Sequence, residues 1–295
     1  MLCFATEMEQ GYLMSFYPIL RAGIAAASIA ILPTGLATSQ QQTSIPSVNS
    51  ILQALDSNRQ HYQHSVPSFY CKEHLESKFV KTYFVRVGGH KRSWVEAVDA
   101  DSTFRVKREP NPDGSSILRG SRKILDERFN GRPVSSRHVE LPSILVGAFT
   151  GGLSLISSSQ QSCLAYSVQK RHRGFRDLYQ IDFATAPKEQ RTSDCILQED
   201  ATGHATVDPQ SMQITHVEIF VPYHQVIAQR PDGSYLPAAY GPWHVEITYA
   251  PITLDKVYWM PSDISAKTVT SDSTWTVRAN YSRYHKLVVT SRIVP

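Results

Sequence analysis

Apolar and polar positions alternate through much of the C-terminal part of the chain. Residues 243–249 read Trp-His-Val-Glu-Ile-Thr-Tyr, so every second residue is apolar and the residues between them are polar. Successive side chains of a strand point to opposite faces of a sheet. The segment therefore predicts a strand with one apolar and one polar face, and Trp275, Val277 and Tyr281 predict a second such strand.

Further strand patterns begin near Phe69 and are separated by turn signals. These signals are Gly88-Gly89, Asn130-Gly131, Arg173-Gly174, Asp208-Pro209-Gln210-Ser211 and Pro231-Asp232-Gly233. Short turns between alternating segments are typical of antiparallel sheets. We expect ten or more strands, and a sheet of that size must curl, split or close.

Two segments interrupt the β pattern. A helix is expected to begin near Ser47 and to fade by His61, with one apolar face formed by Val48, Ile51, Leu52 and Leu55. Residues 141–156 are largely apolar without alternation, which predicts a short helix or apolar loop across the sheet. The predicted fold class is mainly β, a long curled antiparallel sheet or unclosed β-barrel. The fold is expected to include an N-terminal helix and a short apolar helical insertion that lies across the concave face of the sheet.

The first 39 residues have the order of a secretory signal peptide. Arg21 precedes a short apolar core, and small residues lead to a cleavage site after Ser39. The first 13 residues carry two Glu and no basic residue, so we expect translation to start at Met14. An uncleaved N-terminal anchor is the alternative. The expected organisation is a signal peptide over 1–39, a flexible linker over 40–46 and a single β-rich domain over 47–295.

Cleavage after Ser39 predicts a periplasmic or secreted chain of 295 − 39 = 256 residues. One Arg and two Glu leave with the signal, so 29 basic and 24 acidic side chains remain, a net charge of +5. The mild basicity favours anionic lipids or envelope polymers as partners. The chain has no dense run of Lys or Arg, and we therefore expect no nucleic-acid partner.

Export also makes the cysteines oxidisable. Cys71, Cys163 and Cys195 remain after cleavage, so at least one stays unpaired. We favour a Cys163–Cys195 disulfide, because each lies beside a strand-like segment in the middle third of the chain. It would stabilise the fold by about 3–4 kcal/mol in the chain-entropy model. Three buried free thiols are the alternative.

Catalytic signatures are missing from the sequence. The chain has no His-Glu-x-x-His, Gly-x-Ser-x-Gly, phosphate-binding Gly-Lys loop or Cys-x-x-Cys motif. The eleven His are scattered, and the acidic pair Glu199-Asp200 is expected to be solvated. We therefore expect a non-enzymatic protein with no cofactor and no metal site, although dispersed catalytic groups can still meet in space.

Aromatic residues are the strongest positive signal. They either pack a core or line a cavity for an acyl chain, and the scarcity of covering helices favours the cavity. The expected ligand-binding residues, including two from the apolar insertion, are Leu145, Phe149, Trp243, Val245, Ile247, Tyr249, Trp259, Trp275, Val277 and Tyr281.

The order of parts resembles the periplasmic outer-membrane lipoprotein carriers and related lipoprotein-sorting proteins. The hairpin from Gly203 to Ile214, with Asp208-Pro209-Gln210-Ser211 at its turn, is similar to hairpins common in that group. The resemblance implies an unclosed barrel around an apolar cavity. The chain departs from it in its length and in its three cysteines after cleavage.

Three function classes follow from these observations. The first is an exported protein that binds an acyl chain or a lipidated protein in the concavity of the sheet. The second is a structural or assembly component of the envelope, with a packed core and with envelope proteins as partners. The third is an exported hydrolase with dispersed catalytic residues. An apolar cavity would favour the binding protein, and a solid interior would favour the structural component. A polar cleft that brings His together with a carboxylate would favour the hydrolase.

Overall fold

The computed structural model describes residues 45–84, 90–111, 116–134, 148–149, 152–174, 176–226 and 239–288. All of these residues belong to one compact unit. The expected signal peptide and most of the expected linker lie outside the described residues. Within the described residues, no helix is long and apolar enough to cross a membrane.

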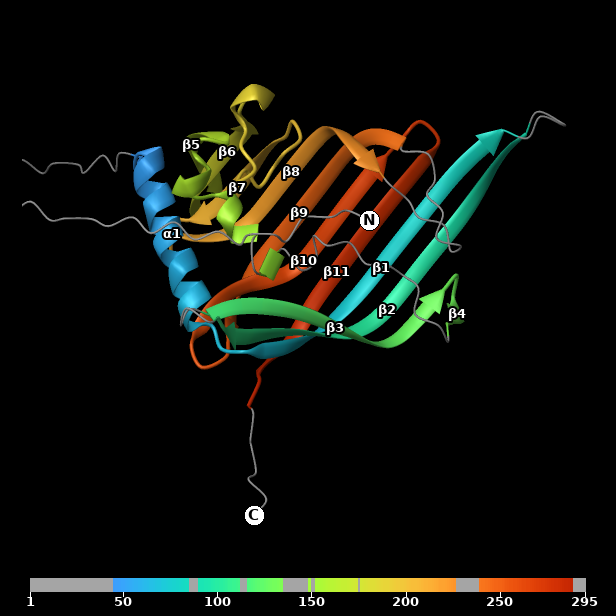
Figure 1. Cartoon of the computed structure of the whole chain (residues 1–295), viewed down its shortest axis with the longest axis horizontal. Coiled ribbons are helices and arrows are strands. Elements are labelled where there is room, and N and C mark those ends of the chain that lie inside the picture. The colour runs from blue at the N-terminus through green and yellow to red at the C-terminus, as the bar shows by residue number, and fades with distance from the viewer. Residues whose placement is uncertain are drawn as a thin grey trace, which may run out of the picture. The chain divides into compact units, whose positions relative to one another are not determined.

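The described strands form one antiparallel sheet that is not closed into a barrel (Figure 1). Its order is β4-β3-β2-β1-β11-β10-β9-β8-β7-β6-β5, so two meanders meet where β1 pairs with β11. The strands are β1 (Phe69–Phe84), β2 (Lys91–Pro110), β3 (Ser116–Phe129), β4 (Arg132–Pro133), β5 (Leu164–Arg173), β6 (Arg176–Thr185), β7 (Thr202–Asp208), β8 (Gln213–Val226), β9 (Ala239–Thr253), β10 (Val257–Val269) and β11 (Ser273–Lys286). The predicted fold class is confirmed.

Burial alternates along the strands as the sequence pattern predicts. On β2, for example, Ala100, Ser102, Phe104 and Val106 are buried while the residues between them are more exposed. We call the face that carries these side chains the inner face, and the opposite face the outer face. Because the period of a strand is two, this alternation sets the register of the whole sheet.

Turn residues supply the backbone conformations that the hairpins require. Asn130 and Gly131 both have positive φ (50° and 76°), as expected for a two-residue turn that matches the twist of the strands. Gly174 (φ 62°) turns the chain between β5 and β6. At the β7–β8 turn, Met212 N–H donates to the Asp208 carbonyl at 2.8 Å and the Ser211 hydroxyl to the Asp208 carboxylate at 2.8 Å.

The helix α1 (Val48–Ser65) begins where the sequence predicts but is one turn longer. Ser47 caps it by accepting a hydrogen bond from Ser50 N–H at 3.2 Å. The extra turn forms because Tyr62 is also buried, and the chain leaves the helix at Val66, directly before a proline. Its buried residues are Ile51, Leu52, Leu55 and Tyr62.

The helix α1 connects the two halves of the sheet. It contacts β3 near one edge, β5 at the other edge and β8 between them. At one end the Tyr258 hydroxyl donates to the Ser65 carbonyl at 3.0 Å, and Asn58 on the helix donates to the Met212 carbonyl at 2.6 Å. A helix that reaches both edges requires a curled sheet, and Figure 1 shows it upright beside β5–β7.

Three short 3₁₀ helices complete the described structure, namely η1 (Gly152–Leu155), η2 (Ser158–Gln160) and η3 (Lys188–Gln190). Ahead of η1, Ala148 and Phe149 are helical and buried. The apolar insertion is therefore helical in the part that the structure describes. It lies close to α1, which contacts both η1 and η2.

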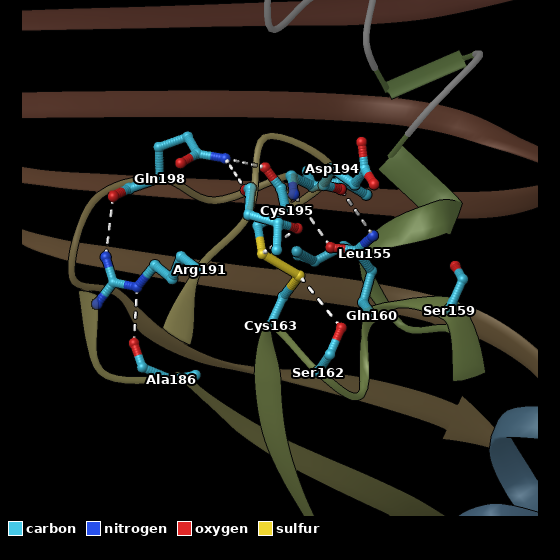
Figure 2. Close-up of a disulfide and its surroundings, with 12 residues drawn as sticks. Leu155, Ser159, Gln160, Ser162, Cys163, Ala186, Arg191, Asp194, Cys195 and Gln198 are labelled. Carbon is cyan, nitrogen blue, oxygen red and sulfur yellow. Dashed lines mark hydrogen bonds between the residues drawn. A yellow bond between two sulfur atoms is a disulfide. The ribbon is translucent and has the colours of Figure 1, made fainter. Parts of the chain in front are cut away.

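The predicted Cys163–Cys195 disulfide is present (Figure 2), with a Cα–Cα distance of 5.4 Å. It ties the start of β5 to the loop between β6 and β7. Arg191 organises that loop by donating to the carbonyls of Ala186 at 2.6 Å and Gln198 at 2.8 Å. Cys71 is a buried free thiol.

Candidate functional site

The predicted ligand-binding residues of β9 and β11 lie on one face of the sheet. Trp243, Val245, Ile247 and Tyr249 on β9 are all buried, as are Val277 and Tyr281 on β11. The strand between them aligns these residues in rows. One row contains Val245, Ala266 and Val277, and the next contains Ile247, Ile264 and Ala279.

Trp275 lies at the end of this apolar surface and is half-buried. The register places it in one row with Trp243, with Thr268 on β10 between them. Its indole N–H donates to the Ser77 hydroxyl at 3.0 Å. Trp243, Thr268 and Trp275 therefore form a third row beside the row of Val245, Ala266 and Val277.

Phe149 from the apolar insertion fills the middle of the inner face. Its ring stacks on Phe104 at 4.7 Å between centroids and meets Tyr281 edge-on at 4.8 Å. Phe69 and Tyr284 lie 6.0 and 6.5 Å away. The hydroxyl of Tyr249 donates to the Ala148 carbonyl at 3.4 Å. Phe149 is thus the residue of the insertion that the described contacts place against the aromatic rings of the inner face.

Two of the predicted ligand-binding residues are not found with the others on the inner face. Leu145 lies outside the described residues. Trp259 is half-buried, and its neighbours Tyr258 and Met260 on β10 are both buried. Because side chains alternate along a strand, Trp259 lies on the opposite side of β10 from these two. We therefore leave Trp259 out of the candidate site.

A buried polar cluster on the inner face escaped the sequence analysis. The Glu73 carboxylate on β1 accepts hydrogen bonds from the Arg122 guanidinium on β3, at 2.7 Å from Nη2, and from the Ser102 hydroxyl on β2. Arg122 also lies over the Phe104 ring, 5.5 Å from its centroid. The available signal was parity, since Glu73 shares the parity of Leu75 in an apolar pattern.

Burial and the charges of this cluster shift the pKa values of Arg122 and of two neighbouring side chains. Burial is the largest single influence on the pKa of Arg122 and lowers it, but the hydrogen bond and the charge of Glu73, together with smaller contributions from Tyr281, raise the pKa overall. Burial, followed by the charge of Glu73, raises the pKa of Tyr281 and likewise raises that of Cys71, to about 12. At neutral pH the tyrosine and the thiol are therefore uncharged beside one compensated ion pair.

Two buried hydroxyls on the inner side belong to no such hydrogen-bond network among the described residues. Among the described residues, the Tyr62 hydroxyl on α1 and the Thr268 hydroxyl on β10 are buried without a hydrogen-bond partner. Tyr62 packs edge-on against Tyr258, with 6.3 Å between ring centroids. A buried hydroxyl without a partner costs free energy, so each marks a position where a polar atom of a ligand would be stabilising.

Two surface depressions of the described residues lie on the outer face. One is lined by Ser167, Asp182, His204 and Glu218, with Phe220 at its side, and has a volume of about 570 Å³. The other extends from β3 and β2 across β1, β11 and β10 to β9 and includes Glu76, His244 and Arg278. Both depressions therefore carry charged and imidazole side chains, although most of the exposed lining of each is apolar.

Comparisons with known proteins show a distant likeness of fold. No protein-family model matches the chain, and no curated protein matches it. A solved structure of a LolA superfamily protein from Nitrosomonas europaea is similar, with a TM-score of 0.31 and 12% sequence identity. The match covers 84% of this chain and 96% of that chain. The residues described above, rather than this match, support the proposals that follow.

Proposed function

We propose that the protein is a non-enzymatic carrier that binds an extended apolar ligand, such as an acyl chain or the lipid of a lipidated protein, on the inner face of the sheet. The observation that carries the proposal is the composition of that face. Val245, Ile247 and Val277 form a continuous apolar surface, and the buried Tyr62 hydroxyl, whose ring packs against Tyr258, has no hydrogen-bond partner among the described residues. An apolar site with few polar groups is the usual environment for such ligands.

The ligand would take the place of the Phe149 ring. This ring enters from the insertion and contacts side chains of β1, β2 and β11. An acyl chain can make the same dispersion contacts with Phe104 and Tyr281 as the ring does. Binding then exchanges one apolar contact surface for another, and the sheet itself need not change.

The proposed compartment is outside the cytoplasm. The Cys163–Cys195 disulfide supports it, because structural disulfides persist mainly in oxidising compartments. N-terminal sequencing of protein from an expressing Gram-negative host tests it, with the mature chain expected to begin at or near Gln40. A soluble cytoplasmic product that begins at Met1 or Met14 would overturn the assignment.

Native mass spectrometry of protein purified from the periplasm tests the ligand, with co-purified lipid as the expected result. Titration with a fluorescent fatty-acid analogue then locates it. Ile247→Glu places a charge on the inner face and should abolish saturable binding. The matched control is Ile117→Glu on β3, where the side chain is 42% exposed, and binding should be unchanged.

A packed structural component of the envelope is the second candidate. The observation that favours it is the contact of Phe149 with several aromatic rings, which is also how a permanent core residue packs. In that case Ile247→Glu should unfold the protein, because a core does not tolerate an unpaired carboxylate. The wild type should then show no saturable probe binding.

A further inference from the structure

Three His-x-Glu pairs occur on the described strands of the sheet. They are His74-Leu75-Glu76, His216-Val217-Glu218 and His244-Val245-Glu246. In each pair the middle residue is apolar and buried, so the His and the Glu share the outer face. The register places Glu218 on β8 directly between Glu246 on β9 and His204 on β7. Residues that are scattered in the sequence therefore form one cluster.

The two oxygens of Glu218 face different partners in this cluster. His204 Nε2 lies 3.3 Å from Oε2, and His244 Nε2 donates to Oε1 at 2.5 Å. Two atoms that each lie about 2.05 Å from a tetrahedral Zn²⁺ are about 3.3 Å apart. The His204–Glu218 pair thus already has the separation of two ligands of one ion.

His216 supplies the third candidate ligand. Its ring lies 6.3 Å from the ring of His204, and one nitrogen of each ring and one Glu218 oxygen all lie within 4.8 Å of one another. His216 Nδ1 lies 3.3 Å from the Thr248 hydroxyl on β9. A ligating histidine commonly forms a hydrogen bond through the ring nitrogen that does not bind the metal, and this bond fixes the orientation of the ring.

The backbone around the cluster is built for a close approach of β7 to β8. A Cβ at Gly203, the residue before His204, would lie 2.1 Å from the Glu218 carbonyl and 2.4 Å from the Phe183 ring. Any other residue at this position would push β7 away from β8. Glycine at position 203 therefore keeps His204 next to Glu218.

Two other groups of ligand-type residues are weaker candidates. In the group of Glu218, His244 and Glu246, Nε2 of His244 faces Glu218 while Nδ1 faces Glu246 at 3.7 Å. This imidazole bridges two carboxylates instead of presenting one nitrogen to an ion between them. The group of His74, Glu76 and Asp99 has a single imidazole and two exposed carboxylates, which is a poor set for a transition metal.

We propose that His204, His216 and Glu218 bind a divalent transition-metal ion, with Zn²⁺ as the best match, on the outer face of the sheet. His244 holds Glu218 through its other oxygen, and Thr248 orients His216. Three protein ligands leave one coordination position for water or for a small ligand. His204 and Glu218 also line the depression of about 570 Å³, which gives such a ligand access. This site is independent of the inner face.

Metal titration of protein purified without a polyhistidine tag and freed of metal with a chelator tests the proposal. Zn²⁺ is followed by calorimetry and Co²⁺ by its visible absorption, which reports coordination geometry. One ion per chain is expected. Thr248→Val should weaken Zn²⁺ binding by roughly 10–100-fold, the usual effect of an outer-shell change, and His204→Gln, His216→Gln and Glu218→Gln should each weaken it further.

Matched controls separate this site from general histidine binding. His172 on β5 is 70% exposed and pairs with Asp177 at 2.6 Å, so His172→Gln should leave binding unchanged. His74→Gln should leave it unchanged as well. The unfolding temperature of each metal-free variant should stay near that of the wild type, because the changes lie on the outer face. Absence of binding in the wild type would overturn the proposal, as would equal losses in the ligand and control variants.

Discussion

Glu73 and Arg122 form an ion pair across two strands that are not neighbours. Glu73 lies on β1 and Arg122 on β3, and the pair spans β2 on the inner face, where the Glu73 side chain is fully buried. The Ser102 hydroxyl on the intervening strand donates to the same carboxylate. The pair therefore links three strands beside the Phe149 ring.

Arg122→Met should lower the free energy of unfolding by about 3–5 kcal/mol, because it leaves the Glu73 carboxylate buried without its cation. The double variant Glu73→Gln/Arg122→Met should recover much of that loss, and urea unfolding measures both. The matched control is Arg119→Met, which breaks an exposed 2.8 Å pair with Glu109. Its cost should be about 0–1 kcal/mol. Equal costs for the two single variants would contradict the assigned role.

Cys71, Cys163 and Cys195 should react differently with thiol reagents. Thiol labelling of denatured, unreduced protein should modify Cys71 alone, because Cys163 and Cys195 are bridged. In the folded protein Cys71 should also be protected, since burial raises its pKa to about 12. Cys163→Ser should reduce the free energy of unfolding by about 2–5 kcal/mol. Labelling of all three thiols without reductant would refute the bridge.

Short-range patterns predicted much of this fold because strand and turn chemistry is local. Period-two alternation was enough to orient residues 243–249, and Asn130-Gly131 has the φ values that its turn requires. Strand length was harder to predict. β2 runs from Lys91 to Pro110 as one strand, because pairing with β1 continues through segments whose own pattern is weak.

Clusters that depend on cross-strand register could not be predicted in the same way. Glu73 and Arg122 are 49 positions apart, and His204 and Glu218 come from different strands. Their parity was visible in the sequence, as was the repeated His-x-Glu pattern. Which strands pair, and in which register, depends on long-range packing, and the sequence alone left that open.

His74 should show a raised pKa. Its hydrogen bond to Asp101 at 3.1 Å is the largest cause, because the carboxylate stabilises the imidazolium. Because the pKa of His74 is higher in the folded protein, the pair stabilises the fold fully at pH values below the pKa of the unfolded state, about 6.5. This contribution disappears as the pH rises through the pKa of the folded state. The side chains are exposed, so the effect should be at most about 1 kcal/mol.

NMR titration of the His74 ring checks this prediction directly. Asp101→Asn should move its pKa back toward about 6.5, and the same change should flatten the pH dependence of stability just above that value. A ring that titrates at the same pH in the wild type and in Asp101→Asn would show that the carboxylate does not hold the charge.

Phe149→Ala separates a carrier from a permanently packed protein. In both cases loss of the ring should cost about 3–5 kcal/mol of unfolding free energy, because Phe149 is 1% exposed among four aromatic rings. In a carrier, the space left by the ring is also the ligand's space. The variant should then bind a fluorescent fatty-acid analogue more tightly than the wild type, and ligand at 100 times its Kd should restore about 2.7 kcal/mol. The matched control is Phe129→Ala on β3, where the ring is 38% exposed and neither quantity should change. A Phe149→Ala protein that is destabilised but neither binds the analogue nor regains stability with it would assign the ring to a packed core and remove the carrier function.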